Sequence, residues 1–250
     1  MSGIFETMRA YNKSIVYFDE HLQRISRASK LIRIKIPYSL PKLKNIIREK
    51  IKKARSRDLY IRLTLSKAKS GAKVSLEVKK YQPFSAKKYR EGFAVMVSSF
   101  WKDERHPLAR IKTTERLLYE LSFQEAKSKG FDEAILLNSR GLIAEGTRAN
   151  IFFVKDKILF IPSLKCGCLD GITKMAVLDL ARINKIKTKQ GNFTAHDLFD
   201  ADEAFLTNSL IGVMPLRRVN KIKIGKGQNN KITQFLGKKY SELLHGNKKD

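Results

Sequence analysis

The chain has 250 residues, 42% of them hydrophobic, and is long enough to bury one sizeable core or two modest ones. Its N-terminus, MSGIFETMRAY, lacks the apolar core of a signal peptide, and no apolar run approaches the roughly 20 residues of a membrane-spanning helix. We therefore expect a globular protein of the cytoplasm. The formal charge of +27 favours contact with polyanions, but the lysines are scattered among apolar residues in nearly every segment. Without zinc-finger spacing or an aromatic ribonucleoprotein motif, nucleic-acid binding is disfavoured, and the lysines are interpreted as solvated faces.

The first third of the chain predicts an α+β unit. β-branched and aromatic residues flank Asn12 and Lys13, which is typical of a hairpin over residues 3–18. Asp19 fits the N-cap of a first helix, and Ser39 fits the N-cap of a second. The further predicted elements of this unit are helices at 21–32 and 41–54 and strands at 58–66 and 72–81.

Residues 101–110, WKDERHPLAR, interrupt the pattern with mixed charges and a proline, and we expect a connector between two domains there. The predicted domains are a small one over 1–105 and a larger one over 106–250. The predicted elements of the second are helices at 114–130, 172–183 and 231–244 and strands at 132–138, 141–145, 149–154, 157–162 and 203–209.

Several kinds of chemistry find no support in the sequence. There is no G-x-S-x-G motif, and the four histidines lack the spacing that places two rings on one metal ion. Cys166 and Cys168 are too close for an ordinary disulfide and lack a second pair of zinc ligands, so we interpret them as reduced thiols and expect no metal site. Residues 171–173, at a helix start, offer backbone N–H groups to a phosphate, but that pattern alone is more typical of a plain N-cap.

Five separated segments resemble the class IV aminotransferases in their order and spacing, over nearly the whole chain. They are GIFETMRAY (3–11), DEHLQR (19–24), the stretch from ARIKTTERLL to EGTRANIFFV (109–154), GCLDGITKMAVL (167–178) and ADEAFLTNSLIGVMPL (201–216).

The resemblance implies a two-domain α+β fold, the type IV fold of pyridoxal-phosphate enzymes seen in D-amino-acid aminotransferases. It also implies pyridoxal 5'-phosphate in the cleft between the domains, and a homodimer. The chain begins near the family's G-D-G segment, so we expect a first strand and turn to be missing upstream of Gly3. Lys174 stands where the family usually has an arginine.

The same resemblance assigns cofactor contacts. Lys112, in the IKT motif, matches the lysine that forms the Schiff base, and Glu145 matches the carboxylate that favours a protonated pyridine nitrogen. Arg24 matches the arginine that binds the phosphate. Further phosphate contacts are expected from residues at a helix start and a strand end: Ile172, Thr173, Thr207 and Asn208.

Two reactions remain open. Met214, in NSLIGVMPL, and Arg116, after the lysine, resemble aminodeoxychorismate lyase, which releases pyruvate and leaves 4-aminobenzoate for folate synthesis. Thr7 matches a threonine whose hydroxyl would relay a proton in that lyase. Arg62 instead resembles a carboxylate-binding arginine of branched-chain aminotransferases. We favour the lyase; the alternatives are a branched-chain or D-amino-acid aminotransferase using 2-oxoglutarate, and a catalytically degenerate polyanion-binding protein.

Overall fold

The computed structural model describes residues 3–69, 71–225 and 231–246. They form two compact units: unit 1 lies within Met1–Pro83, Ile111–Glu115 and Ser241–Asp250, and unit 2 within Phe84–Arg110 and Arg116–Tyr240. The predicted boundary near residue 105 does not coincide with the division into these units. Strand β5 (Phe93–Lys102) belongs to unit 2 because it pairs with two strands of that unit, whereas residues 111–115 return to unit 1.

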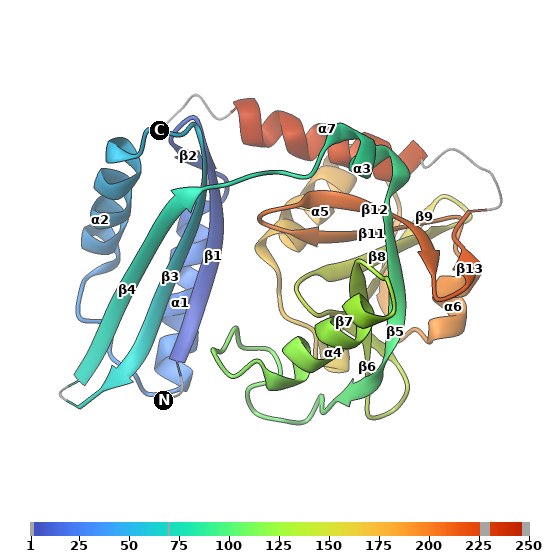
Figure 1. The fold of residues 1–250 in the computed structure, drawn as a ribbon, viewed down its shortest axis with the longest axis horizontal. Coiled ribbons are helices and arrows are strands. Elements are labelled where there is room, and N and C mark those ends of the chain that lie inside the picture. Colours follow the sequence, from blue (N-terminus) through green and yellow to red (C-terminus); the bar gives the residue numbers. More distant parts are fainter. Residues whose placement is uncertain (1–2, 70, 226–230, 247–250) are drawn as a thin grey trace. The chain divides into compact units, whose positions relative to one another are not determined.

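Unit 1 is a four-stranded antiparallel sheet covered on one face by two helices (Figure 1). The strand order is β2-β1-β3-β4, and burial alternates along β3 because successive side chains point to opposite faces of the sheet. The buried face packs against apolar residues of both helices in one core. The elements are β1 (Gly3–Tyr11), β2 (Ser14–Ile15), α1 (Phe18–Leu31), α2 (Leu40–Lys53), β3 (Asp58–Ala68) and β4 (Gly71–Lys80).

The turns and caps of unit 1 confirm most of the local predictions. Asn12 and Lys13 have φ values of 48° and 69° in the turn of the predicted hairpin. Ser39 caps α2 by accepting a hydrogen bond from a backbone N–H. The predicted N-cap of α1 was wrong: Tyr17, in the left-handed conformation, precedes the helix, and Asp19 lies in its first turn.

Unit 2 is built on a mixed sheet of order β10-β9-β8-β11-β12-β5-β6-β7, with β13 paired to β12. Strand β5 runs parallel to both of its neighbours, β12 and β6. Six elements of this unit were not predicted from the sequence: α3, β5, β10, α6, β12 and β13. The remaining elements are α3 (Ala86–Glu91), α4 (Leu117–Ser128), β6 (Glu133–Asn138), β7 (Ile143–Gly146), β8 (Asn150–Lys155), β9 (Ile158–Pro162), η1 (Leu164–Cys166), α5 (Ile172–Ile183), β10 (Thr188–Gly191), α6 (Ala195–Phe199), β11 (Glu203–Asn208), β12 (Gly212–Val219), β13 (Ile222–Lys223) and α7 (Lys231–Gly246), whose last residues belong to unit 1.

The two cysteines lie in the interior of unit 2. Both are free thiols, and burial raises the pKa of Cys168 to about 12, so its thiolate form is disfavoured. None of the helices in the described ranges is both long and apolar enough to cross a bilayer.

Candidate active site

Lys112 lies on a short segment that pairs with the outer edge of β1 in unit 1. The Phe5 N–H donates to the Lys112 carbonyl at 3.0 Å, and the Thr114 N–H donates to the Gly3 carbonyl at 2.8 Å. The Lys112 Nζ lies 4.9 Å from the centroid of the Phe5 ring. The predicted cofactor lysine is thus carried by backbone that the sheet orients.

Thr7 and Arg62 lie on the same face of this sheet as Phe5. Thr7 is directly opposite Arg62 in the antiparallel pair of β1 and β3, and Phe5 is two residues from Thr7 on β1. The Arg62 guanidinium carbon lies 4.0 Å from the Phe5 ring centroid. The structure therefore brings Lys112 and Arg62 to one aromatic ring and places Thr7 on the same face of the sheet.

Arg24, the predicted phosphate ligand, is oriented by a buried carboxylate. Its Nε and Nη2 donate to the two oxygens of Glu6 at 2.7 and 2.6 Å, and His21 Nδ1 lies 2.8 Å from Glu6 Oε2. Burial alone would raise the pKa of Glu6, but Arg24 and His21 together lower it to about 2. Burial also lowers the pKa of His21. Glu6 and His21 were not among the predicted site residues, although the H-x-x-R spacing places His21 and Arg24 on one face of α1.

Glu145, the predicted partner of the pyridine nitrogen, is buried on β7 in unit 2. Its Oε1 accepts hydrogen bonds from Lys102 Nζ at 2.5 Å and from the Tyr119 hydroxyl at 3.0 Å. Its Oε2 accepts one from the Leu169 N–H at 2.9 Å. Burial, and then the Glu145 charge, raise the pKa of Tyr119, which keeps this hydroxyl a donor. Sequence analysis gave no signal for Lys102, one lysine among many.

The loop before α5 is held next to Glu145. Asn150 Nδ2 donates to the Leu169 carbonyl at 2.8 Å, so Glu145 and Asn150 bind the two ends of the same residue's backbone. Gly171 is tightly packed: a Cβ on it would lie 1.9 Å from Asn150 Oδ1. The close approach of this loop therefore requires a glycine.

The start of α5 and the end of β11 have the features of a phosphate site. Within the described chain, no acidic side chain lies in the first turn of α5, whose N-terminal N–H groups include those of Ile172 and Thr173. Thr207 is 1% exposed, and its Oγ1 has no hydrogen-bond partner among the described residues. A buried hydroxyl without a partner is unfavourable unless a ligand satisfies it. These residues fit a phosphate-bearing cofactor.

Lys174 and Asn208 are engaged in local contacts. Lys174 is 3% exposed, and its Nζ donates to Asp170 Oδ1 at 2.7 Å. Asn208 Nδ2 donates to the Arg148 carbonyl at 3.0 Å, and its Oδ1 accepts from two N–H groups in the turn after β11. Asn208 thus organises the strand end that carries Thr207.

Two residues predicted to contact substrate occupy structural positions. Met214 is fully buried in the hydrophobic core of unit 2. Arg116 donates to the Thr147 carbonyl at 2.7 Å, and Thr147 in turn donates to the buried Glu133. We therefore leave Met214 out of the proposed substrate surface and assign Arg116 to ordering the loop that follows Glu145.

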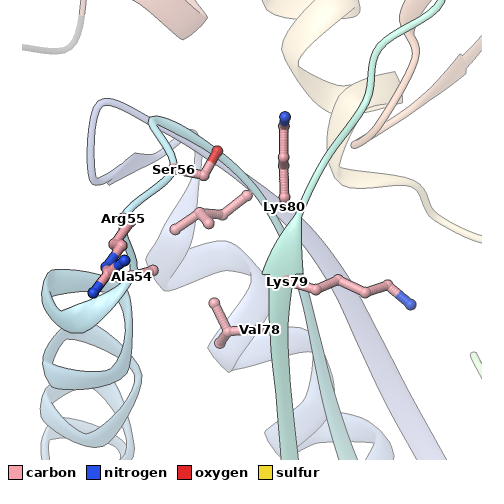
Figure 2. A pocket seen from close by; sticks show the side chains of 7 residues that line it. Ala54, Arg55, Ser56, Val78, Lys79 and Lys80 are labelled. Atoms are coloured by element: carbon pink, nitrogen blue, oxygen red, sulfur yellow. The ribbon is translucent and has the colours of Figure 1, made fainter.

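A separate surface hollow of about 490 Å³ lies in unit 1, where α2 and β4 end (Figure 2). Its charged residues are Arg55, Lys79 and Lys80, and Lys79 is paired with Glu77 at 2.8 Å. The carboxyl end of a helix does not favour anions, and none of the predicted site residues lines this hollow. We assign it no part in the site.

Comparisons with known proteins agree with this geometry. A family model described as amino-transferase class IV matches residues 3–219. The branched-chain-amino-acid aminotransferase of Pseudomonas aeruginosa is 30% identical over 260 residues, which cover 98% of this chain and 84% of that protein. The crystal structure of the T.th. branched-chain amino acid aminotransferase with pyridoxamine 5'-phosphate has a TM-score of 0.92 at 27% identity, covering 98% of this chain and 86% of that one. A putative 4-amino-4-deoxychorismate lyase from Legionella pneumophila has a TM-score of 0.84 at 22% identity, covering 94% of this chain and 90% of that one, and shares the fold.

The fold and the residues that suit a phosphate and a pyridine ring define a pyridoxal-phosphate enzyme of mixed α+β architecture. The chain belongs to the class IV aminotransferase family. This confirms the predicted family, fold class, enzyme class and cofactor, pyridoxal 5'-phosphate.

Proposed function

We propose that this chain is an aminotransferase that moves an amino group between an amino acid and a 2-oxo acid. The observation that carries the proposal is the Phe5 ring, which has the Lys112 amine 4.9 Å and the Arg62 guanidinium 4.0 Å from its centroid. An α-amino acid needs a base near its Cα and a cation near its carboxylate. Lys112 and Arg62 supply these two groups on one face of one sheet.

Lys112 would bind the cofactor through its amine and, once released, carry the proton removed from the substrate Cα. When bound, the cofactor supplies an electron-accepting ring that stabilises the charge left on Cα. Arg62 would hold the substrate carboxylate, because a guanidinium fork matches two carboxylate oxygens.

The cofactor contacts that we propose fall into two groups, one at the ring nitrogen and one at the phosphate. Glu145 would face the ring nitrogen, since a carboxylate favours the protonated ring. Arg24 would bind the phosphate in the orientation that Glu6 imposes. The remaining phosphate donors would be the N–H groups of Ile172 and Thr173, the hydroxyl of Thr207 and the turn organised by Asn208.

For the substrate, we propose a branched-chain amino acid with 2-oxoglutarate as the amino acceptor. The names of the relatives at 30% and 27% identity support this class. A D-amino acid is the alternative within the aminotransferases.

Aminodeoxychorismate lyase is the second candidate, and Thr7 is the observation that favours it. Thr7 lies opposite Arg62, where its hydroxyl would relay a proton to the leaving enolpyruvyl group. The other two features behind the lyase prediction lend less support, since Met214 is a core residue and Arg116 holds the Thr147 carbonyl.

Cofactor binding is tested first. We expect purified protein with pyridoxal phosphate to develop the absorbance band of a Schiff base. Borohydride should remove this band and leave the cofactor covalently attached, and Lys112→Ala should show neither the band nor the attachment. Lys67→Ala, which removes an exposed lysine of β3, is the matched control and should keep the band. A band retained in Lys112→Ala would contradict the assignment of the lysine.

The reaction is tested by offering two substrate pairs. A branched-chain amino acid with 2-oxoglutarate should give glutamate, and aminodeoxychorismate should give no pyruvate. Arg62→Ala should raise KM for the amino acid at least tenfold, because the carboxylate loses a charge-assisted contact. Pyruvate without glutamate would overturn the aminotransferase proposal in favour of the lyase.

We also propose that the protein is a cytoplasmic homodimer, as the family resemblance suggests. Light scattering during gel filtration should give twice the mass of the 28.7 kDa chain at micromolar concentration. A monomer with full activity would contradict this.

A further inference from the structure

Lys102 and Glu145 form a buried ion pair at the end of β5. Their side chains are 5% and 7% exposed, and the Nζ–Oε1 distance is 2.5 Å. The Tyr119 hydroxyl lies 2.6 Å from Lys102 Nζ and 3.0 Å from Glu145 Oε1, which closes a three-membered cluster. The Leu169 N–H occupies the other carboxylate oxygen. Glu145 is thus neutralised by a lysine of its own unit.

A buried ion pair requires full hydrogen bonding to offset its desolvation, and removal of one partner leaves an uncompensated charge. A cation that approaches Glu145 meets a carboxylate already paired with Lys102, and it also meets the positive charge of Lys102. The attraction of Glu145 for a protonated ring nitrogen is therefore reduced.

We propose that Lys102 is a positioning residue that holds the Glu145 carboxylate in place and limits how strongly it favours a protonated cofactor ring. This rests on the proposed role of Glu145 at the ring nitrogen. Lys102 acts through Glu145. Its removal should therefore alter the preference of the protein for a ring that carries the nitrogen, and not only the stability of the fold.

The first test is the stability of the cofactor-free protein. Lys102→Met should unfold at a lower denaturant concentration than the parent at pH 8, and the deficit should shrink as the pH falls to 5. The reason is that a buried carboxylate without its cation is penalised and gains by taking up a proton. Arg116 and Cys168 also act electrostatically on Tyr119, and Lys174 acts on Cys168. Burial raises the pKa of Cys168 to about 12, so its thiol does not change charge between pH 5 and pH 8.

Three further variants distinguish loss of the Lys102–Glu145 ion pair from nonspecific destabilisation. Lys102→Arg should restore the pH profile of the parent, since it restores the cation. The double variant K102M/E145Q should be more stable at pH 8 than K102M alone, because no buried charge is left unpaired. Lys52→Met removes the lysine of an exposed pair with Glu49 and should leave the profile unchanged. The role of the ion pair would be overturned if the loss of stability in K102M were independent of pH. It would also be overturned if the loss were equal in K102M/E145Q.

The second test measures binding of pyridoxamine 5'-phosphate, which has no aldehyde and binds without a covalent link. Its Kd is compared with that of the analogue in which carbon replaces the ring nitrogen. The Kd of the carbon analogue divided by the Kd of pyridoxamine 5'-phosphate should rise at least tenfold in K102M. The reason is that Glu145, without Lys102, should bind the protonated ring nitrogen more strongly. This ratio should match the parent in Lys102→Arg and Lys52→Met.

The outcomes separate two failures. Tight binding of both compounds with an unchanged ratio in K102M would overturn the role of Lys102 and leave the proposed function standing. No binding of either compound to the parent protein would overturn the proposed function, and with it the role of Lys102 at the ring. If K102M is too unstable to titrate, the same ratio is measured in Lys102→Gln, whose neutral amide removes the positive charge. A ratio equal to that of the parent would then overturn the role of Lys102.

Discussion

At the scale of single residues, two buried carboxylates are each paired with neighbouring side chains. Glu6 binds Arg24 and His21 in unit 1, and Glu145 binds Lys102 and Tyr119 in unit 2. Each has a cation within hydrogen-bond distance, so neither leaves its charge unpaired. Glu6 orients Arg24, which we propose as a phosphate ligand, and Glu145 is itself the residue that we propose for the ring nitrogen.

Glu6→Gln should lower the free energy of unfolding by about 3 kcal/mol at pH 7. The pKa of Glu6 is lowered to about 2 from 4.5, so its stabilisation is complete above pH 4.5 and is lost as the pH falls towards 2. Urea unfolding at pH 7, 4 and 3 should therefore show a smaller loss in Glu6→Gln than in the parent. Glu49→Gln, at an exposed pair, is the control and should change little; equal pH dependence of Glu6→Gln and the parent would contradict the prediction.

Gly171→Ala should destabilise the protein by about 1–3 kcal/mol, because its Cβ would overlap the Asn150 side chain. Displacement of Asn150 releases the Leu169 carbonyl, so the affinity for pyridoxamine phosphate should fall at least tenfold. Calorimetric titration and denaturant unfolding measure the two effects. Asn150→Ala added to Gly171→Ala removes the overlap and should recover part of the stability; no loss in the single variant would contradict the predicted packing.

At the scale of elements, local patterns predicted the hairpin, α2, α5 and the long strands of unit 1. Two of their failures have different causes. The N-cap of α1 is Tyr17 in place of Asp19, because a left-handed residue turns the chain from β2 into the helix. β5 was not predicted because its burial comes from β12 and β6, which are distant in sequence.

Helix α7 offers a test of element stability. Gly237 lies inside it, and a Cβ there would be 3.7 Å from Val213 Cβ, an ordinary contact. Gly237→Ala should raise the free energy of unfolding by about 0.5–1 kcal/mol, because alanine favours the helix. The same substitution at Gly212 should destabilise, since φ is +62° and a Cβ would lie 3.0 Å from Tyr240. Thermal unfolding of both variants should shift in opposite directions; a shared direction would contradict the argument.

At the scale of the whole molecule, the chain contributes to two units and passes between them several times. Lys112, Arg24, Thr7 and Arg62 belong to unit 1, whereas Glu145 and the start of α5 belong to unit 2. The net charge of +27 has no role in the proposed chemistry. It bears on the alternative that the protein binds polyanions.

We expect the protein to be retained on a heparin column at low salt and to elute over a narrow range as the salt concentration rises. The reason is that the interaction is nonspecific charge attraction and involves no specific binding site. Lys112→Ala should elute with the parent, since one charge among 51 basic residues is removed. The salt concentration at which each protein elutes measures this. Retention at high salt, or loss of retention in Lys112→Ala, would favour a specific polyanion site.

The order of the motifs alone identified the family and the cofactor and predicted the cofactor lysine. This was possible because the residues around Lys112, Glu145 and residues 171–173 are adjacent in sequence and form local motifs. Tertiary structure decided what those residues contact. Glu6 with Arg24, Lys102 with Glu145, and Lys112 with Phe5 are pairs brought together by strand pairing and helix packing across 18, 43 and more than a hundred residues. It also placed Met214 in the core, because the side of the sheet on which a strand residue lies depends on how its neighbours pack and not on its own identity.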